Sequence, residues 1–433
     1  MPLQLFRGSI LHCLQDPGDS LHSRDAPYFE DGGLLVAEGR VQAVGSYSDF
    51  QSSFTEDTEV IDYSGKLIVP GFVDTHIHFV QTDIIASYGE QLLSWLEKYT
   101  FPAERAFADN EHAIAVAEFF IEELLRNGTT TALVLGSVHP QSVDAIFSAA
   151  QRKKMRLIAG KVLMDRNCPE CLRDTPETGY SESRELIERW HHEARLSYAI
   201  TPRFALTSSP QQLQRSAELA AEYPDVYVHT HLAENRAEVA EVAKLFPEAR
   251  SYLDVYDRYG LLRDRSMYAH GIHLDADDRK RLAETGASVA FCPSCNLFIG
   301  SGLFDLKTAW EFGIRVGLGT DVGGGPTFNM LQVLCDAYKV AQLNSFSLSP
   351  YRALYLATLA GAEALRIDDR IGNFAAGKEA DFIVLDPGAT PLLQRRTSLT
   401  DDITDKLFAL IMLGDDRAVW ATHLMGNRVM LGT

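Results

Sequence analysis

Residues 69–79 have the sequence Val-Pro-Gly-Phe-Val-Asp-Thr-His-Ile-His-Phe, and the prediction of the fold starts from this stretch. The Pro-Gly pair favours a break in the chain, and the apolar residues that follow predict a short buried strand. His76 and His78 are two positions apart on that strand, so both imidazoles point to the same face and together suit one metal ion. Because the chain has 13 histidines, such a pair alone is weak evidence. The metal site needs support from the rest of the sequence.

From residue 70 onward, short apolar stretches alternate with longer helical patterns, as is typical of βα units. We expect strands at residues 72–79, 129–135, 156–164, 198–204, 226–232, 266–274, 288–295 and 315–321. Helices are expected between them, among others at residues 110–126, 181–195, 210–222 and 277–285. Eight such units within residues 70–375 predict an α/β fold, a (β/α)8 TIM barrel.

Both ends of the chain are predicted to form β structure. Short apolar pieces separated by glycine-containing turns lie at residues 34–37, 41–44, 60–62, 380–385, 419–424 and 428–431. The simplest arrangement is one small β-sandwich domain built from residues 1–69 and 376–433, with the barrel between them in the sequence.

Composition narrows the possible partners. The 433 residues include 40 basic and 59 acidic side chains, a net charge of −19, and 46% are hydrophobic. This balance argues against nucleic acids and anionic membranes as partners and favours a metabolic enzyme with a sizeable core. The sequence shows no signal-peptide pattern and no apolar run near 18 residues, so we expect a cytoplasmic protein.

Two Cys-x-x-Cys pairs, Cys168/Cys171 and Cys292/Cys295, occur among the six cysteines. Together they would suffice for a four-thiolate zinc site, but nothing around them resembles a zinc ribbon. Free, partly buried thiols are the favoured interpretation, since disulfides are rare in the cytosol.

Residues 88–107 form a long insertion after the first barrel strand and include Trp95. On a barrel the βα loops lie over the active site, so the insertion suits a lid. Packing on the outside of the barrel, or at a subunit contact, is equally compatible with its length.

Polar residues occur at the ends of several predicted strands, which on a barrel is the catalytic end. They are His76, His78, Arg203, Phe204, His229, His231, Glu234, His270, His273 and Asp321. Imidazoles with one carboxylate suit a divalent ion such as zinc that keeps a position open for water and lowers the pKa of that water to roughly 7. Asp321 and Glu234 then suit proton transfer.

Several motifs resemble the metal-dependent amidohydrolase superfamily. They are the Pro-Gly-Phe-Val-Asp-Thr-His-Ile-His stretch, His231-Leu-Ala-Glu234, Ala269-His270-Gly and Gly319-Thr-Asp321. Within that superfamily, residues 96–104, 201–206, 231–236 and 317–324 resemble the guanine deaminase family. The resemblance spans the whole chain, and it includes the composite β-sandwich domain.

The resemblance implies one zinc ion per subunit, with iron as the alternative metal, and a homodimer. The implied metal ligands are His76, His78, His231 and Asp321, with His270 as a further ligand or as the holder of the reacting water. The implied contacts to guanine are Gln81, Arg203, Phe204, His231, Glu234 and Asp321, with Trp95 and Leu96 in the base pocket. The implied reaction is hydrolytic deamination of guanine to xanthine and ammonia, in which Glu234, Asp321 and His270 are catalytic.

Each of these residues also has a purely structural interpretation. Asp321 precedes a run of glycines and would serve as a loop cap, and Glu234 would serve as a favourable acid at a helix start. Arg203 would suit a surface ion pair. His229, two residues before His231, is interpreted as a satisfied core histidine, and His273 as a residue behind or at the rim of the site.

Three rival functions follow from the same sequence. A deaminase of cytosine, an adenosine derivative or a triazine shares the metal motif but not the residues around Arg203 and Trp95. A two-metal amidase needs a bridging lysine at the end of the fourth strand, where this chain has Thr-Pro-Arg-Phe. A non-catalytic scaffold would have lost metal ligands, and all the candidates are present.

Overall fold

The computed structural model describes residues 3–20, 24–51, 58–88 and 91–432. Two compact units are present. The first contains Met1–Val73, Glu122–Thr131 and Phe328–Thr433, and the second contains Asp74–Ile121 and Ala132–Thr327. The domain boundaries expected at residues 69/70 and 375/376 stay a prediction. None of the helices in the described ranges combines the length and the apolar character that a membrane crossing needs.

Eight strands of one sheet follow one another in chain order, and the pairs from β7 to β13 are parallel. They are β5 (Phe72–His78), β6 (Thr129–Leu135), β7 (Arg156–Gly160), β9 (Leu196–Pro202), β10 (Tyr227–Leu232), β11 (Ser266–His270), β12 (Ser288–Phe291) and β13 (Arg315–Leu318). The third predicted strand is divided into β7 and the short β8 (Val162–Leu163), which pairs with β9. With helices between the strands, the predicted (β/α)8 barrel is confirmed.

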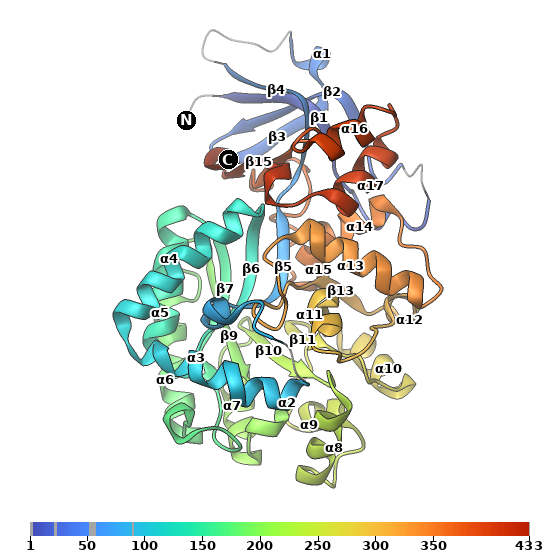
Figure 1. Cartoon of the computed structure of the whole chain (residues 1–433). Coiled ribbons are helices and arrows are strands. Elements are labelled where there is room, and N and C mark those ends of the chain that lie inside the picture. The colour runs from blue at the N-terminus through green and yellow to red at the C-terminus, as the bar shows by residue number, and fades with distance from the viewer. Residues whose placement is uncertain (1–2, 21–23, 52–57, 89–90, 433) are drawn as a thin grey trace. The chain divides into compact units, whose positions relative to one another are not determined.

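Helices separate the barrel strands along the chain. They are α4 (Asn110–Arg126), α5 (Pro140–Lys153), α6 (Pro176–Trp190), α7 (Pro210–Glu222), α8 (Arg236–Leu245), α9 (Tyr252–Arg258), α10 (Ala276–Thr285), α11 (Pro293–Phe298) and α12 (Leu306–Glu311). Figure 1 shows α5, α6 and α7 outside the strands, where α5 packs on β7 and the other two on β9. Helix α6 begins five residues earlier than predicted because Thr175 caps it and Pro176 suits its first turn.

Backbone and side-chain hydrogen bonds connect the first barrel strand to the segment after the last one. The N–H of Asp321 donates to the carbonyl of His76, and the N–H of His78 donates to the carbonyl of Val322, both at 2.9 Å. Behind them, the buried Asp74 carboxylate accepts a bond from the hydroxyl of Thr320 at 2.5 Å. These contacts hold the loop after β13 against the end of β5, so residues far apart in the sequence become neighbours.

The first unit contains a seven-stranded sheet in the order β16-β15-β14-β4-β1-β2-β3. Its strands are β1 (Gln4–Leu11), β2 (Tyr28–Ala37), β3 (Arg40–Ser46), β4 (Glu59–Pro70), β14 (Phe382–Leu385), β15 (Val419–Leu424) and β16 (Asn427–Leu431). Strands β1 and β4 are parallel, and β14 pairs with β4 antiparallel. The two chain ends therefore form one β structure, as predicted.

Buried side chains from both ends of this sheet share one apolar core. Val36 and Val41 from β2 and β3 belong to the same cluster as Phe382 and Ala421 from β14 and β15. Burial of this apolar cluster stabilises the sheet. The sequence predicts no individual strand at residues 4–11, although β1 lies inside the sheet, between β4 and β2.

Helices complete the first unit. They are α1 (Tyr47–Phe50), α13 (Met330–Leu343), α14 (Pro350–Ala357), α15 (Leu359–Ala364), α16 (Pro391–Thr397) and α17 (Ile403–Leu413). Side chains of Thr390 and Asp402 cap α16 and α17.

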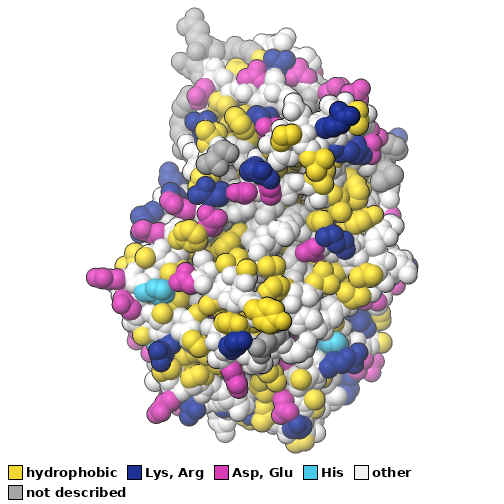
Figure 2. All heavy atoms as spheres, in the orientation of Figure 1, with side chains coloured by type: hydrophobic (Ala, Val, Ile, Leu, Met, Phe, Trp, Pro, Cys, Tyr) yellow, Lys and Arg dark blue, Asp and Glu magenta, His cyan; other side chains and the backbone are white. Residues whose placement is uncertain are grey.

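Figure 2 shows acidic and basic side chains interspersed on one face of the molecule, with no continuous basic surface on that face.

Candidate active site

Four metal-donor side chains meet at the carboxyl end of the barrel strands, within the second unit. His76 and His78 belong to β5, His231 to β10, and Asp321 follows β13. Oδ1 of Asp321 lies 3.1 Å from Nε2 of His76 and 3.3 Å from Nε2 of His78. Nε2 of His231 lies 3.2 Å from Nε2 of His78. One donor atom from each residue lies within 4.8 Å of the others, so the four residues are placed to share one ion.

Two of these imidazoles have Nδ1 within hydrogen-bond distance of a group outside the set of four donors. Nδ1 of His231 lies 2.7 Å from the carbonyl oxygen of Arg203. Because a carbonyl only accepts, Nδ1 carries the hydrogen and Nε2 presents its lone pair to the site. Nδ1 of His76 lies 2.7 Å from Nε2 of His229, a fully buried residue. His229 is therefore a buried, hydrogen-bonded histidine, as predicted, and its partner is a metal-donor side chain.

His270 approaches the four donors from β11. Its Nε2 lies 3.4 Å from Oε2 of Glu234 and 3.6 Å from Oδ2 of Asp321. Its Nδ1 lies 2.9 Å from Oδ1 of Asn296. Both expected roles of His270, as a ligand or as the residue that holds water, are compatible with this position.

The residues present fit a divalent ion. Three imidazoles and one carboxylate form a donor set that suits zinc or iron. In the described part of the chain, Nε2 of His76 and Nε2 of His270 are buried without a hydrogen-bond partner. Buried polar atoms of this kind are costly unless they bind something. The chemistry of the donors and their unpaired nitrogens therefore both favour a metal.

Burial and charge set the protonation of the donors. Burial lowers the pKa of His78 to about 3 and that of His231 well below its usual value, so both imidazoles are neutral, as ligands must be. Burial alone would raise the pKa of Asp321, but the neighbouring His76 and His78 outweigh it and hold the pKa well below its usual range. Asp321 is therefore ionised.

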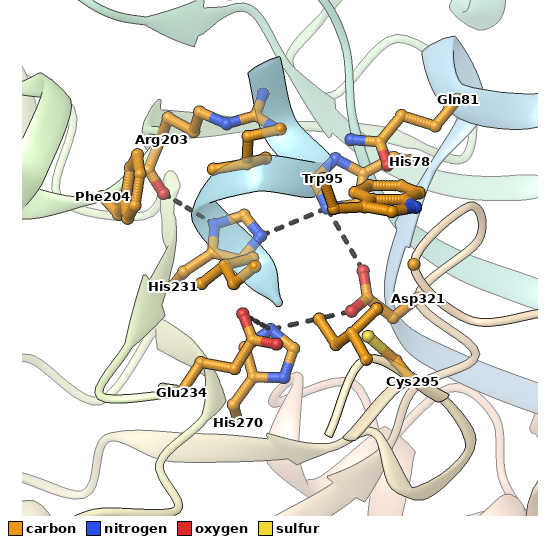
Figure 3. A pocket seen from close by; sticks show the side chains of 14 residues that line it. His78, Gln81, Trp95, Arg203, Phe204, His231, Glu234, His270, Cys295 and Asp321 are labelled. Carbon is orange, nitrogen blue, oxygen red and sulfur yellow. Dashed lines mark hydrogen bonds and ion pairs between the residues drawn. The ribbon is translucent and has the colours of Figure 1, made fainter. Parts of the chain in front are cut away.

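Glu234 follows β10 at the edge of the same pocket, on the same side as His270 in Figure 3. Burial raises the pKa of Glu234 to about 7, against the opposing effect of His270. The hydroxyl of Ser301 donates to Oε1 at 2.7 Å. A buried carboxyl with a pKa near neutrality suits both the uptake and the release of a proton.

The predicted base-binding residues line the same pocket. Figure 3 shows Arg203 and Gln81 on one side of it and Glu234 and His270 on the other. Phe204, Trp95 and Leu96 add apolar surface to its walls. The structure thus brings every predicted substrate contact to one place, from segments as far apart in sequence as residue 81 and residue 321.

Some residues of the site carried no assigned role in the sequence analysis. Glu104 is fully buried and forms an ion pair with Arg203, with Nη1 of the arginine 2.7 Å from Oε1 of the glutamate. Ser301 binds Glu234, and Nε2 of His273 lies 3.2 Å from the carbonyl oxygen of Ser301. Glu104 lies in the stretch 96–104 that carried the family resemblance, which was its one signal in the sequence.

The insertion after β5 forms the wall that contains Trp95 and Leu96. It consists of α2 (Leu92–Trp95), a π-helical stretch (Leu96–Thr100) and α3 (Phe101–Arg105), while residues 89 and 90 lie outside the described residues. Helix α3 packs on the 3-10 turn Phe79–Ile84, which directly follows β5. Closure of the insertion as a lid stays a prediction.

A second cluster of metal-ligand type, His191, His192 and Asp225, lies away from the pocket. The backbone N–H of Tyr198 donates to Nδ1 of His191, so the hydrogen of the neutral ring is on Nε2, which lies 3.2 Å from Asp225. A protonated Nε2 does not ligate a metal. Nε2 of His192 forms a hydrogen bond with Asp225 at 2.5 Å, so the carboxylate has a partner without a metal.

None of the six cysteines, all within the described residues, forms a disulfide, and five of them are buried. Cys292 and Cys295 are buried within the barrel, and Cys171 is exposed. The described ranges contain no cluster of cysteines within metal-binding distance of one another. The four-thiolate zinc site has no support in those ranges.

Comparison with known proteins agrees with this geometry. The model of the amidohydrolase family matches residues 67–429. The guanine deaminase of Escherichia coli (strain K12) is 55% identical over 402 residues, which cover 93% of this chain and 92% of that protein. The solved structure of E. coli guanine deaminase has a TM-score of 0.96 at 52% identity, with 99% of both chains covered.

A further solved structure is similar along its full length. Guanine deaminase from C. acetobutylicum, solved with guanine bound in its active site, has a TM-score of 0.90 at 26% identity and covers 99% of this chain and 100% of that one. The matched residues include all four metal-donor residues and, from the terminal sheet, the end of β4 and strands β14 and β15. The chain therefore belongs to the amidohydrolase family, in which it groups with the guanine deaminases.

Proposed function

We propose that the protein hydrolyses guanine to xanthine and ammonia. One observation carries the proposal: a single pocket is lined by metal-donor side chains, by the Glu234 carboxyl group with its pKa of about 7, and by the hydrogen-bond donors of Arg203 and Gln81. In the reaction a C–O bond forms at C2 of the base and the C2–N bond to the amino group breaks. Water supplies the oxygen, and the amino group leaves as ammonia.

The metal proposed is one zinc ion per subunit, held by His76, His78, His231 and Asp321, with iron as the alternative. When bound, such an ion acts as a Lewis acid and lowers the pKa of water to roughly 7. His270 lies close enough to Asp321 and Glu234 to orient the attacking water or to join the ligands. The buried unpaired Nε2 of His270 supports either role.

Proton transfer is assigned to Glu234 and Asp321. The nucleophilic water must lose both of its protons in the course of the reaction, one to a ring nitrogen of guanine and the other to the departing amino group. Glu234, with a pKa of about 7, is able to take a proton and then release it. Asp321, held ionised by His76 and His78, is the second acceptor. Ser301 binds Oε1 of Glu234 and leaves Oε2 on the side of His270.

Recognition of the base is assigned to the opposite wall. The Arg203 guanidinium offers N–H donors to the carbonyl oxygen O6, and Gln81 offers a further polar contact. Phe204, Trp95 and Leu96 supply apolar surface for a planar purine. The name and bound ligand of the C. acetobutylicum structure support this assignment of substrate.

Ammonia release by the purified protein tests the proposal. Guanine is compared with adenine, cytosine and an adenosine derivative, and bound metal is counted by elemental analysis. We expect rapid release from guanine alone and about one zinc per chain. Turnover of another base with metal bound would keep the metal chemistry and overturn the assignments of Arg203 and Gln81. Absence of both metal and turnover would overturn the whole proposal.

A homodimer in the cytoplasm completes the proposal. The homodimer is what the resemblance to the family implies, and the cytoplasm is the location expected from the sequence pattern. Sedimentation of the purified protein and fractionation of the source cells test them. A monomer at assay concentration, or recovery in a membrane fraction, would contradict them.

A further inference from the structure

Glu104 is a completely buried carboxylate to which the proposed reaction assigns no step. It belongs to α3, in the insertion that follows the first barrel strand. Nη1 of Arg203 donates to Oε1 at 2.7 Å and to Oε2 at 2.9 Å, and Nε2 of Gln81 donates to Oε1 at 3.1 Å. Glu104 thus contacts both polar residues of the base-binding wall at once.

These contacts determine how the Gln81 amide is oriented. An ionised carboxylate only accepts, so Glu104 requires the NH2 group of Gln81 to face it. On the other side of the amide, the backbone N–H of Gly323 lies 3.4 Å from Oε1, so it requires the oxygen there. Two neighbours on different segments therefore select the same orientation. Gln81 keeps the second lone pair of Oε1 for the pocket that it lines.

The same carboxylate determines what Arg203 presents. Its Nη1 is occupied by Glu104, which leaves the N–H groups of Nη2 and Nε for other partners. The side chain is only 3% exposed, and a buried cation is costly unless a counter-charge lies beside it. The ring of Phe101, also from α3, has its centroid 5.8 Å from Cζ of Arg203. The insertion therefore holds the guanidinium by charge and by an aromatic contact.

We propose that Glu104 is a positioning residue for substrate specificity: it orients Arg203 as a donor and Gln81 as an acceptor toward the O6–N1 edge of the base. This inference rests on the proposed function, because it assigns an edge of guanine to that wall. Guanine presents a carbonyl acceptor at O6 next to an N–H donor at N1, which is complementary to a donor beside an acceptor. A purine without the 6-oxo group lacks both features.

The test compares guanine with 2-aminopurine, which keeps the reacting amino group at C2 but has no O6 and no hydrogen on N1. When a site forms hydrogen bonds with a polar edge of its substrate, kcat/KM for an analogue without that edge is lower by about 10⁴-fold. The kcat/KM values for both substrates are measured in the wild type, in Glu104→Gln and in Glu104→Asp. Bound zinc and Tm are measured in each variant. Glu97→Gln, an exposed acid of the same insertion, is the matched control for loss of charge.

In Glu104→Gln we expect kcat/KM for guanine to fall by about 100-fold, mostly through KM, with metal content unchanged. The expected fall for 2-aminopurine is less than about 5-fold, so the preference for guanine shrinks by 20-fold or more. Glu104→Asp keeps the charge and is expected to restore part of the preference. Glu97→Gln should behave as the wild type. If Glu104 served stability alone, the substitution would instead lower kcat/KM by the same factor for both substrates.

An unchanged preference in a folded, metal-loaded Glu104→Gln variant would overturn the inference while leaving the proposed function intact. Failure of the wild type itself to release ammonia from guanine would overturn both. Should Glu104→Gln not fold, Glu104→Asp decides the question. Its preference for guanine is expected to fall at least 3-fold, and an unchanged preference would reject the role assigned to Glu104.

Discussion

Buried histidines occur in both units of the molecule, but their ring nitrogens are used differently. In the terminal sheet, Nε2 of His423 accepts the hydroxyl of Tyr63 at 2.9 Å, and Nδ1 lies 3.3 Å from the carbonyl of Gly426. In the barrel, Nε2 of His76 is buried without a hydrogen bond in the described residues. The first ring is satisfied by its neighbours, whereas the second lies within reach of three other metal donors.

This difference shows that burial alone does not identify a functional histidine. His423 is 2% exposed and His76 is 0% exposed, so the two are alike by that measure. The partner of each ring nitrogen separates them. A neutral imidazole whose two nitrogens are both paired has no lone pair to give to a metal. An imidazole whose Nε2 faces a carboxylate and other imidazoles still has that lone pair available for a metal.

The largest effect is expected from removal of one metal-donor histidine in the barrel. In His231→Asn, the metal site loses one ligand, so we expect bound zinc to fall well below one per chain and kcat to fall by more than about 10³-fold. Elemental analysis and the ammonia assay check this. Treatment of the wild type with a chelator should give the same loss, reversed by added zinc. Full activity in metal-free protein would contradict the assignment.

The next largest effect is expected from loss of the proton-transfer group. It distinguishes a residue that binds the metal from one that transfers protons. Glu234→Gln removes the group whose pKa burial raises to about 7, so we expect kcat to fall by about 10³-fold while zinc stays near one per chain. Steady-state kinetics and a metal count are read on the same preparation. Loss of metal in this variant would instead mean that Glu234 is a ligand.

His229 sharpens the comparison, since it is a buried barrel histidine that contacts a donor but is not one of the four. In His229→Leu, the support at Nδ1 of His76 is lost, so we expect zinc affinity to fall 10- to 100-fold. A competition titration against a chelator of known affinity measures this. Unchanged affinity would place His229 with the purely structural histidines.

The smallest effect is a pH dependence on the terminal-sheet side. Burial lowers the pKa of His423 to about 4, below its unfolded value of about 6.5. The stabilising effect of the neutral ring is therefore complete above pH 6.5 and is lost as the pH falls toward 4, at most about 3 kcal/mol. His423→Gln should have a lower Tm at pH 7.5 and a flatter decline between pH 6.5 and 4.5.

Thermal unfolding of the wild type and the variant across this pH range provides the measurement. The two curves should converge by roughly 5 °C as the pH falls. Zinc content at neutral pH should be equal in both proteins, because His423 belongs to the first unit. Parallel curves would show that His423 does not titrate on unfolding.

Local patterns in the sequence predict much of the fold. The strands from β5 to β13 follow from apolar runs bounded by turn residues, and His76 and His78 share a face because of the two-residue period of a strand. Placing Asp321 beside them needed the barrel as well, since the closure of the barrel makes the ends of the first and last strands neighbours.

The contacts that the sequence analysis missed are those that depend on distant segments. Glu104 and Arg203 are 99 positions apart, and neither has a local signature that names the other. His229 follows the same alternation as any core residue of a parallel strand, so its contact with His76 has no signal in the sequence. Strand β1 contains Arg7 and Ser9 among its apolar residues, which weakens the strand pattern although the pairing in the sheet is regular apart from one bulge.

The connectivity of the terminal sheet has a consequence for synthesis of the chain on the ribosome. Strand β4 ends at Pro70, but its antiparallel neighbour β14 begins at Phe382. At 5–20 residues per second, the edge of β4 waits roughly 15–60 s before its partner is made. An unpaired strand edge is a template for aggregation, so the nascent protein carries an exposed edge throughout translation of the barrel. Its yield in cells is expected to depend on chaperones that bind this early segment.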